Sequence, residues 1–231
     1  MGRIKNILFD LDDTIYDFGA AEEHALAKLL RDIGVEPTEE RMQLYSGINL
    51  SYWKRLELGE VSRAQVKVGR FETFFQEIHV EFSAERADEI YRMYLSQGHF
   101  FMPGAEEMLQ DLWRDYRLFL VTNGTTTVQK GRIASGQIEK YFEKIFISEM
   151  IGHNKPSTEF FTYCFSQMGE FSKDETIIIG DSLTSDIKGG INAGITTMWF
   201  NVRGERNQTD ISPDYEIHKL SEVKELLQRI E

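Results

Sequence analysis

The sequence predicts an α/β fold: a doubly wound parallel sheet with helices on both faces and a helical insertion. Three apolar runs lack the alternation of half-exposed strands, which is typical of strands buried on both faces; they lie at 7–9, 118–121 and 177–179. Asp10 and Thr122 directly follow two of these runs, and Asp181 follows the third one residue later. Because such folds bind ligands at the carboxyl ends of their strands, we expect these residues to share one site.

Further segments complete this Rossmann-like core. Two more strands are predicted at 145–147 and 196–200. Helices are predicted around the later strands, at 104–115, 125–139, 157–168 and 185–193. Alternation of strands with helix-length segments favours parallel strands, because each parallel connection needs a crossover.

An insertion separates the first strand from the rest of the core. Between Thr14 and Thr122 lie 107 residues, whereas one βαβ unit needs about 30. We therefore expect a helical cap domain at 17–100 and an α/β core made of 1–16 and 101–231. Cap helices are predicted at 21–33, 39–45, 62–78 and 84–94. Phe71, Phe74 and Phe75 fall on one helix face and predict the core of this cap, the alternative being an aromatic box that faces a ligand.

The net charge and the cysteine content limit which molecules the protein can bind and where it can work. The chain has 26 basic and 38 acidic residues, a net charge of −12, which repels polymeric nucleic acid and anionic membranes but leaves a small anionic substrate possible. The single cysteine, Cys164, excludes an internal disulfide framework. No apolar run approaches the roughly 20 residues that span a bilayer, and the first strand begins almost at once. We expect a cytoplasmic monomer or homodimer.

The first motif is Asp10-Leu11-Asp12-Asp13-Thr14, directly after a strand. A carboxylate at such a strand end can attack phosphorus and divide a hydrolysis into two steps. A second carboxyl group two residues later can protonate the leaving oxygen and then deprotonate water. The alternative is an acidic helix N-cap, with Asp12 or Asp13 capping the next helix.

Two further motifs supply groups that suit a phosphate. Thr122-Asn123-Gly124 offers a hydroxyl, an amide and a permissive backbone at a strand end, which favours a phosphate cradle, although the same tripeptide makes a good turn. Lys155, ahead of a predicted helix, is a candidate to neutralise the phosphate, or else an ordinary surface lysine.

The fourth motif runs from Gly180 to Asp186 and pairs Asp181 with Asp186 across a strand-to-helix turn. Such carboxylates can ligate a hard cation, the alternative being a capped helix start. Ionised Asp10, Asp181 and Asp186 carry −3, a phosphate monoester adds about −2, and Lys155 supplies only +1. We therefore expect a divalent cation, and all-oxygen ligands favour Mg²⁺.

In order and spacing, the four motifs resemble the haloacid dehalogenase superfamily, most of whose members are Mg²⁺-dependent phosphatases that work through an aspartyl-phosphate. The resemblance implies the following roles: Asp10 as nucleophile, Asp12 as general acid/base, Thr122 and Lys155 as the second- and third-motif residues, and Asp181 and Asp186 as the acids of the metal site. It also implies that Mg²⁺ is bound by Asp10, by the backbone carbonyl of Asp12 and by the fourth-motif acid.

The segments 52–75, 122–124 and 178–201 are similar to the bacterial pyrimidine 5′-nucleotidases of this superfamily. This likeness implies a nucleoside monophosphate as substrate, with Asn123 and Gly124 at the phosphate. In the cap segment, Asn49 and Trp53 are candidates to contact the base, since an amide can bond its edge and an aromatic face can stack on it. Tyr16 and Phe18, just after the first motif, are further candidates. The alternative is that these side chains pack the cap.

Other functions of the same fold stay open. A sugar-phosphate phosphatase or a phosphomutase would use the same aspartate pair. A 2-haloacid dehalogenase would leave Asp12 and Asp181 without a purpose, because halide displacement needs neither Mg²⁺ nor an acid for the leaving group. A non-catalytic binding module is disfavoured because every expected catalytic position is filled.

Overall fold

Six parallel strands form one sheet in the computed structural model, which describes residues 3–230. The strand order is β3-β2-β1-β4-β5-β6, the order of a doubly wound dinucleotide-binding fold. In chain order the strands are β1 (Asn6–Phe9), β2 (Arg117–Thr122), β3 (Lys144–Ile147), β4 (Thr176–Gly180), β5 (Thr196–Phe200) and β6 (Tyr215–Ile217). β1 lies between β2 and β4, so the three polar strand ends found in the sequence meet at one edge.

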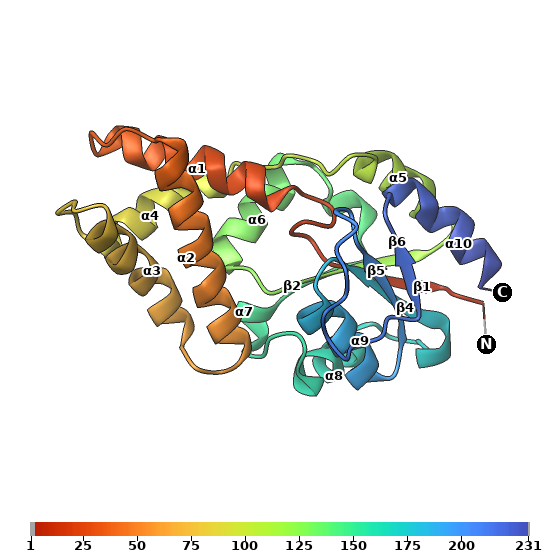
Figure 1. Cartoon of the computed structure of the whole chain (residues 1–231). Coiled ribbons are helices and arrows are strands. Elements are labelled where there is room, and N and C mark those ends of the chain that lie inside the picture. The colour runs from red at the N-terminus through yellow and green to blue at the C-terminus, as the bar shows by residue number, and fades with distance from the viewer. Residues whose placement is uncertain (1–2, 231) are drawn as a thin grey trace.

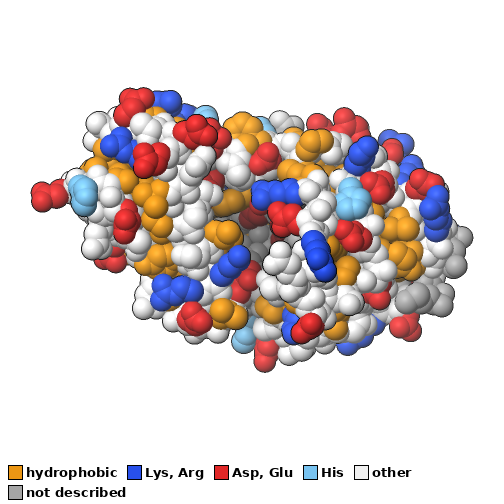
Figure 2. Space-filling model, viewed as in Figure 1, with side chains coloured by type: hydrophobic (Ala, Val, Ile, Leu, Met, Phe, Trp, Pro, Cys, Tyr) orange, Lys and Arg blue, Asp and Glu red, His pale blue; other side chains and the backbone are white. Residues whose placement is uncertain are grey.

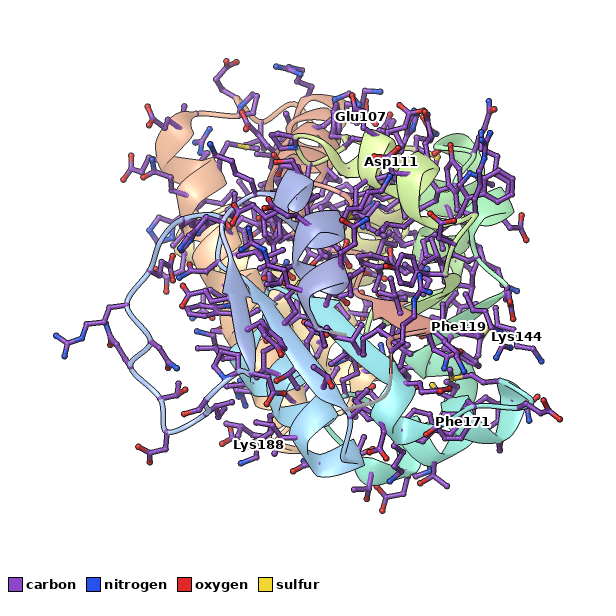
Figure 3. All side chains as sticks on the ribbon, turned by 90° about the vertical axis from the view of Figure 1, so that its right-hand side faces the viewer. Glu107, Asp111, Phe119, Lys144, Phe171 and Lys188 are labelled. Carbon is purple, nitrogen blue, oxygen red and sulfur yellow. The ribbon has the colours of Figure 1, made fainter. Side chains whose placement is uncertain are left out.

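Apolar side chains fill both faces of the sheet. Alternate residues of a strand point to opposite faces, and Ile7 and Phe9 of β1 join one apolar cluster while Leu8 joins the other. The core helices are α5 (Ala105–Leu112), α6 (Thr126–Ser135), α7 (Ser148–Ile151), α8 (Thr158–Gln167), α9 (Lys188–Ala193) and α10 (Val223–Arg229). Figure 3 shows α5, marked by Glu107 and Asp111, on the opposite side of the sheet from Lys188 of α9.

A second group of helices lies beyond the carboxyl ends of the strands, away from both chain ends (Figure 1). Its members are α1 (Phe18–Asp32), α2 (Glu39–Glu57), α3 (Arg63–Glu77) and α4 (Ala84–Leu95). Their buried apolar side chains form a cluster with Val128 of α6 that contains Phe71, Phe74 and Phe75, so these rings pack in a core and form no ligand-facing box. The division into a cap at 17–100 and a core stays a prediction. The chain enters this helix group near Asp17 and leaves it near Phe100. These two linkers are hydrogen-bonded, since the Asp17 amide donates to the Phe100 carbonyl at 2.8 Å.

The structure extends the sequence prediction in three places. Helix α2 continues to Glu57, twelve residues past its predicted end at Tyr45, and apart from Asn49 its second half is exposed or half-buried. β6 and α10 were not predicted. The predicted helix at 185–193 is divided into a π-helical turn, Leu183–Ile187, and α9. No helix among residues 3–230 combines the length and apolar character of a membrane span.

Candidate active site

Three carboxyl groups gather at the carboxyl ends of β1 and β4. Asp10 follows β1, Asp181 follows β4, and Asp186 lies on the π-helical turn, a distortion that often marks functional sites. One oxygen of each lies within 4.8 Å of the others. Asp10 and Asp186 are 6% and 1% exposed. The sheet order therefore brings together residues that are more than 170 positions apart in the chain.

Lys155 is the cation of this cluster, and it is 1% exposed. Its Nζ donates to Asp10 Oδ1, to Asp186 Oδ1 at 2.6 Å and to the Val121 carbonyl at 2.9 Å. Burial by itself lowers the pKa of Lys155, but Asp10 and Asp186 raise it above its usual value. Lys155 is therefore an ion-paired residue of the site and not a surface lysine.

The carboxylates outnumber their cation. Burial raises the pKa of Asp10 well above its usual value, and Asp186 adds to this shift although Lys155 opposes it. Burial and the neighbouring Asp10 and Asp186 also raise the pKa of Asp181 well above its usual value. Crowded carboxylates of this kind ionise together only when a cation compensates them. Three carboxylate oxygens within reach of one another, from buried Asp10 and Asp186 and half-buried Asp181, therefore fit a hard divalent cation.

The Asp12 side chain lies apart from this group. Its Oδ1 pairs with Nη1 of Arg132, and its Oδ2 accepts from Nε2 of Gln129 at 2.7 Å. The helix-capping alternative applies to its neighbours, since Asp17 caps α1 and Asp13 accepts from the Phe18 amide at 2.9 Å. Asp12 thus caps no helix, and two side chains of α6 bind its carboxyl group.

The second motif is tied to the third and fourth by hydrogen bonds. Asn123 Oδ1 accepts from the Lys155 amide at 2.8 Å, and its Nδ2 donates to the Lys155 carbonyl at 2.9 Å and to Ser185 Oγ at 3.2 Å. Thr122 Oγ1 accepts from the Gly124 amide at 3.2 Å. A Cβ on Gly124 would lie 2.3 Å from the Gln129 amide nitrogen, so any larger residue there would displace the Gln129 side chain. Asn123 holds the backbone that carries Lys155; substrate binding by Asn123 and Gly124 stays a prediction.

One cap residue reaches into the core loops. Arg63 of α3 donates to the Asn123 carbonyl at 3.1 Å and also bonds Ser148 Oγ and Asn154 Oδ1. Its guanidinium lies 5.9 Å from the centre of the half-buried Trp53 ring. Figure 2 shows the surface hollowed between the cap helices and the sheet, with acidic and basic side chains along the hollow. Trp53 is thus linked through Arg63 to the second motif.

Other cap candidates have partners of their own. Asn49 is 2% exposed, donates to Glu22 at 2.6 Å and accepts from Arg70 at 2.8 Å, so its amide serves a network inside the cap. Tyr16 is fully buried and packs edge-on against Phe101. Substrate contact by Asn49 stays a prediction that these contacts do not favour.

Sequence patterns missed four polar side chains near the site. Gln129 and Arg132 reach Asp12 from α6, Arg63 reaches the second motif, and Glu57 accepts from the Thr184 hydroxyl at 3.3 Å. Gln129 and Arg132 are three residues apart and so share a helix face, the one local signal that could have paired them. Each of the four acts across elements distant in the chain, which a local pattern does not reveal.

Comparison with known proteins agrees with this fold. The family model described as haloacid dehalogenase-like hydrolase matches residues 7–200. The chain is 39% identical over 227 residues to the HAD-hydrolase YfnB of Bacillus subtilis, covering 98% of this chain and 97% of the relative. A magnesium-bound crystal structure of YfnB superposes with a TM-score of 0.94 at 38% identity, covering 98% and 99% of the two chains.

Two further relatives carry a more specific name. Pyrimidine 5′-nucleotidase PynA of Streptococcus pneumoniae is 38% identical over 226 residues, covering 97% of this chain and 95% of the relative. Pyrimidine 5′-nucleotidase YjjG of Escherichia coli is 29% identical over 221 residues, covering 96% of each. The extent of these matches, together with the buried aspartate cluster, shows that the chain belongs to the haloacid dehalogenase-like hydrolases. The resemblance noted in the sequence is confirmed.

Proposed function

We propose that the protein is a Mg²⁺-dependent phosphomonoester hydrolase that acts through an aspartyl-phosphate on pyrimidine nucleoside 5′-monophosphates. The observation that carries the proposal is the contact of buried Asp10 with Lys155, beside Asp181 and Asp186. This site presents a carboxylate nucleophile, a fixed positive charge and a cation-binding set of oxygens at one strand edge. The cytoplasm stays our expectation for its compartment.

The chain's own groups divide the reaction into two steps. Asp10 attacks phosphorus, the bond from phosphorus to the ester oxygen breaks, and the leaving oxygen takes a proton from Asp12. Water then attacks the aspartyl-phosphate, Asp12 takes back a proton, and inorganic phosphate leaves. Lys155 stabilises the negative charge on Asp10 and the phosphoryl group throughout. Asp10, Asp181 and the Asp12 carbonyl would hold Mg²⁺, with Asp186 beside them, and the ion would supply further charge stabilisation at phosphorus.

A dehalogenase function is less consistent with these contacts. Displacement of halide from carbon needs one carboxylate nucleophile, and it gives no purpose to a second carboxyl group or to a cation site. Here Asp12 is held by two partners from α6, and Asp181 lies with Asp10 and Asp186. Both features have a use in phosphoester hydrolysis.

The substrate class is supported by two independent points. PynA and YjjG are named pyrimidine 5′-nucleotidases and match nearly the full chain. In addition, the half-buried Trp53 lies beside Arg63, which contacts the Asn123 and Gly124 carbonyls. An aromatic face near the phosphate loop can stack on a base.

The deciding experiment measures kcat/KM with Mg²⁺ for uridine and thymidine monophosphates beside several sugar phosphates. We expect the nucleotides to lead by tenfold or more, with no action on polynucleotides. A sugar phosphate that leads by tenfold would refute the pyrimidine substrate and leave the phosphatase proposal standing. Absence of hydrolysis of any monoester would refute both.

A further inference from the structure

A fully buried arginine of α6 binds the carboxyl group assigned as the general acid/base. Arg132 is fully buried, and its Nη1 pairs with Oδ1 of Asp12. The Gln129 Nε2 donates to Asp12 Oδ2 at 2.7 Å and to Thr122 Oγ1 at 2.8 Å, while its Oε1 accepts from Arg132 at 3.2 Å. Both oxygens of Asp12 are therefore fixed by two neighbouring side chains of one helix.

The guanidinium of Arg132 is itself fixed by the linker that returns from the cap. Its Nε donates to the Gly98 carbonyl at 2.7 Å, and its charge lies 5.3 Å from the centre of the Tyr16 ring. Helix α6 sits tightly on this linker, since a Cβ on Gly131 would lie 2.7 Å from the Ser96 carbonyl oxygen. Arg132 thus connects Asp12 to both ends of the insertion.

The partner of this buried arginine distinguishes it from a purely structural one. Burying a cation is costly unless a fixed anion and hydrogen bonds compensate it. The anion here is the carboxyl group assigned as the general acid/base, which is 30% exposed, whereas Asp88, the anion of the buried Arg70 in the cap, is only 5% exposed. Arg132 therefore fixes a carboxyl group that is open to solvent, unlike the enclosed ion pair of Arg70.

We propose that Arg132, assisted by Gln129, is the positioning residue of the general acid/base. Arg132 orients the Asp12 carboxyl group toward the leaving oxygen. Because Arg132 also binds the Gly98 carbonyl, this orientation depends on how the cap is placed on the core. This inference rests on the proposed phosphatase function. Because Arg132 acts through Asp12, its loss should slow hydrolysis only of substrates whose leaving group needs a proton.

The test compares two leaving groups in the variants Arg132→Met and Asp12→Asn. Uridine monophosphate releases a poor leaving group that needs a proton, whereas p-nitrophenyl phosphate releases a good one that hardly does. We expect Arg132→Met to lower kcat for the nucleotide about 100-fold and for the aryl ester less than about fivefold, because a positioned acid contributes about 10²–10⁴-fold. KM should change little, and Arg132→Lys should recover part of the loss.

The double variant Asp12→Asn/Arg132→Met separates positioning from a structural role. If Arg132 acts through Asp12, the double variant is no slower than Asp12→Asn alone. Equal losses on both substrates, or losses that multiply in the double variant, overturn the inference. A wild-type protein that hydrolyses neither ester overturns the proposed function and this inference with it, so the two failures are distinct.

Two further variants keep the test decisive if Arg132→Met does not fold. Gln129→Met removes one hydrogen bond to Asp12 and leaves the ion pair, so we expect a smaller loss with the same dependence on leaving group; no such dependence overturns the inference. Arg70→Met is the matched control, because Arg70 is also buried and ion-paired, but with Asp88 in the cap. It should lower the melting temperature and leave the ratio of the two substrates unchanged.

Discussion

The protein buries two clusters of charged side chains, one at the carboxyl ends of the strands and one inside the cap. In the first, Lys155 pairs with Asp10 and Asp186, and Asp181 lies beside these two acids, so one cation faces three carboxyl groups. Burial raises the pKa of Asp10 and Asp181 well above their usual values. The cluster is therefore complete only with a further cation.

The cap cluster is balanced. Arg70 pairs with Asp88 at 2.7 Å, and Arg92 pairs with the other oxygen of Asp88 at 2.6 Å. Asn49 joins Arg70 to Glu22 through two hydrogen bonds. Two arginines thus face two acids, and no charge is left over.

The difference separates a site from a structural network. Both clusters are buried and both combine acids with cations, so neither burial nor residue type distinguishes them. The balance of charge distinguishes the two clusters. An uncompensated buried charge is costly, so a protein keeps one mainly where a ligand or a reaction uses it. The cap network holds helices together, whereas the core cluster is built for an added cation and an anionic substrate.

The largest effect is expected when the nucleophile is removed. Asp10→Asn keeps the shape of the side chain but cannot form the aspartyl-phosphate, so we expect kcat to fall by about 10³-fold or more. The same chemical change in the cap, Asp88→Asn, is the control and should leave kcat of the folded protein close to wild type. Turnover of Asp10→Asn above a few per cent would contradict the assignment of the nucleophile.

Removing the divalent cation should affect the core cluster alone. Excess chelator should abolish hydrolysis, because three crowded carboxylates then face an anionic substrate with only Lys155 to compensate them. Mg²⁺ should restore the rate, whereas Ca²⁺, with longer bonds and higher coordination, should inhibit. Mg²⁺ should also raise the melting temperature of the wild type more than that of Asp181→Asn. Full activity in chelator is the outcome that excludes this mechanism.

Breaking the charge balance of the cap network should lower the free energy of unfolding and leave kcat unchanged. Asp88→Asn leaves Arg70 buried without its anion, so we expect the free energy of unfolding to fall by about 3–5 kcal/mol. Urea unfolding measures this loss, and kcat at a temperature where the variant is folded checks the chemistry. A stable variant with low kcat would mean that the cap network serves catalysis.

A smaller effect is expected at the mouth of the site. Trp53→Ala should raise KM for uridine monophosphate about tenfold, since stacking of a base on an aromatic ring contributes about 1–3 kcal/mol. KM for p-nitrophenyl phosphate should change less. Trp113→Ala, just after α5, is the matched control, because this ring is 44% exposed and packs on Tyr141. Equal KM values for wild type and Trp53→Ala would remove Trp53 from the substrate site.

The smallest effect concerns an ion pair that joins cap and core. Glu149 accepts from Lys67 at 2.8 Å and from the Thr126 amide at 2.7 Å. Burial by itself would raise the pKa of Glu149, but these hydrogen bonds lower it to about 2. A lowered folded-state pKa stabilises the protein above the unfolded value of about 4.3 and loses this contribution as the pH falls toward 2.

Glu149→Gln should therefore reduce the free energy of unfolding at pH 7 by less than about 1 kcal/mol, because the pair is partly exposed. Urea unfolding at successive pH values should show the difference from wild type narrowing below about pH 4.3. A double-mutant cycle with Lys67→Met isolates the pair. A difference that stays constant down to pH 3 would show that the carboxylate charge plays no part.

Local pattern in the sequence was enough to predict five of the six strands and to single out polar residues near their carboxyl ends. Each of β1 to β5 contains a short run of apolar or β-branched residues, and a strand buried on both faces needs such a run whatever its neighbours are. Asp10, Thr122, Lys155 and Asp181 border such runs or the predicted helices. Their meeting followed from the parallel sheet, because all carboxyl ends of its strands lie at one edge.

The tertiary structure alone decided which side chains act on one another across elements. Whether Asn49 faces a substrate or Glu22 and Arg70 depends on how α1, α2 and α3 pack. The pairing of Asp12 with Arg132 depends on how α6 lies on the linker. Periodicity gives the face on which a side chain lies and not the partner that the face meets. That partner is set by the packing of elements distant in the chain, and with it the charge balance that separates the site from the cap network.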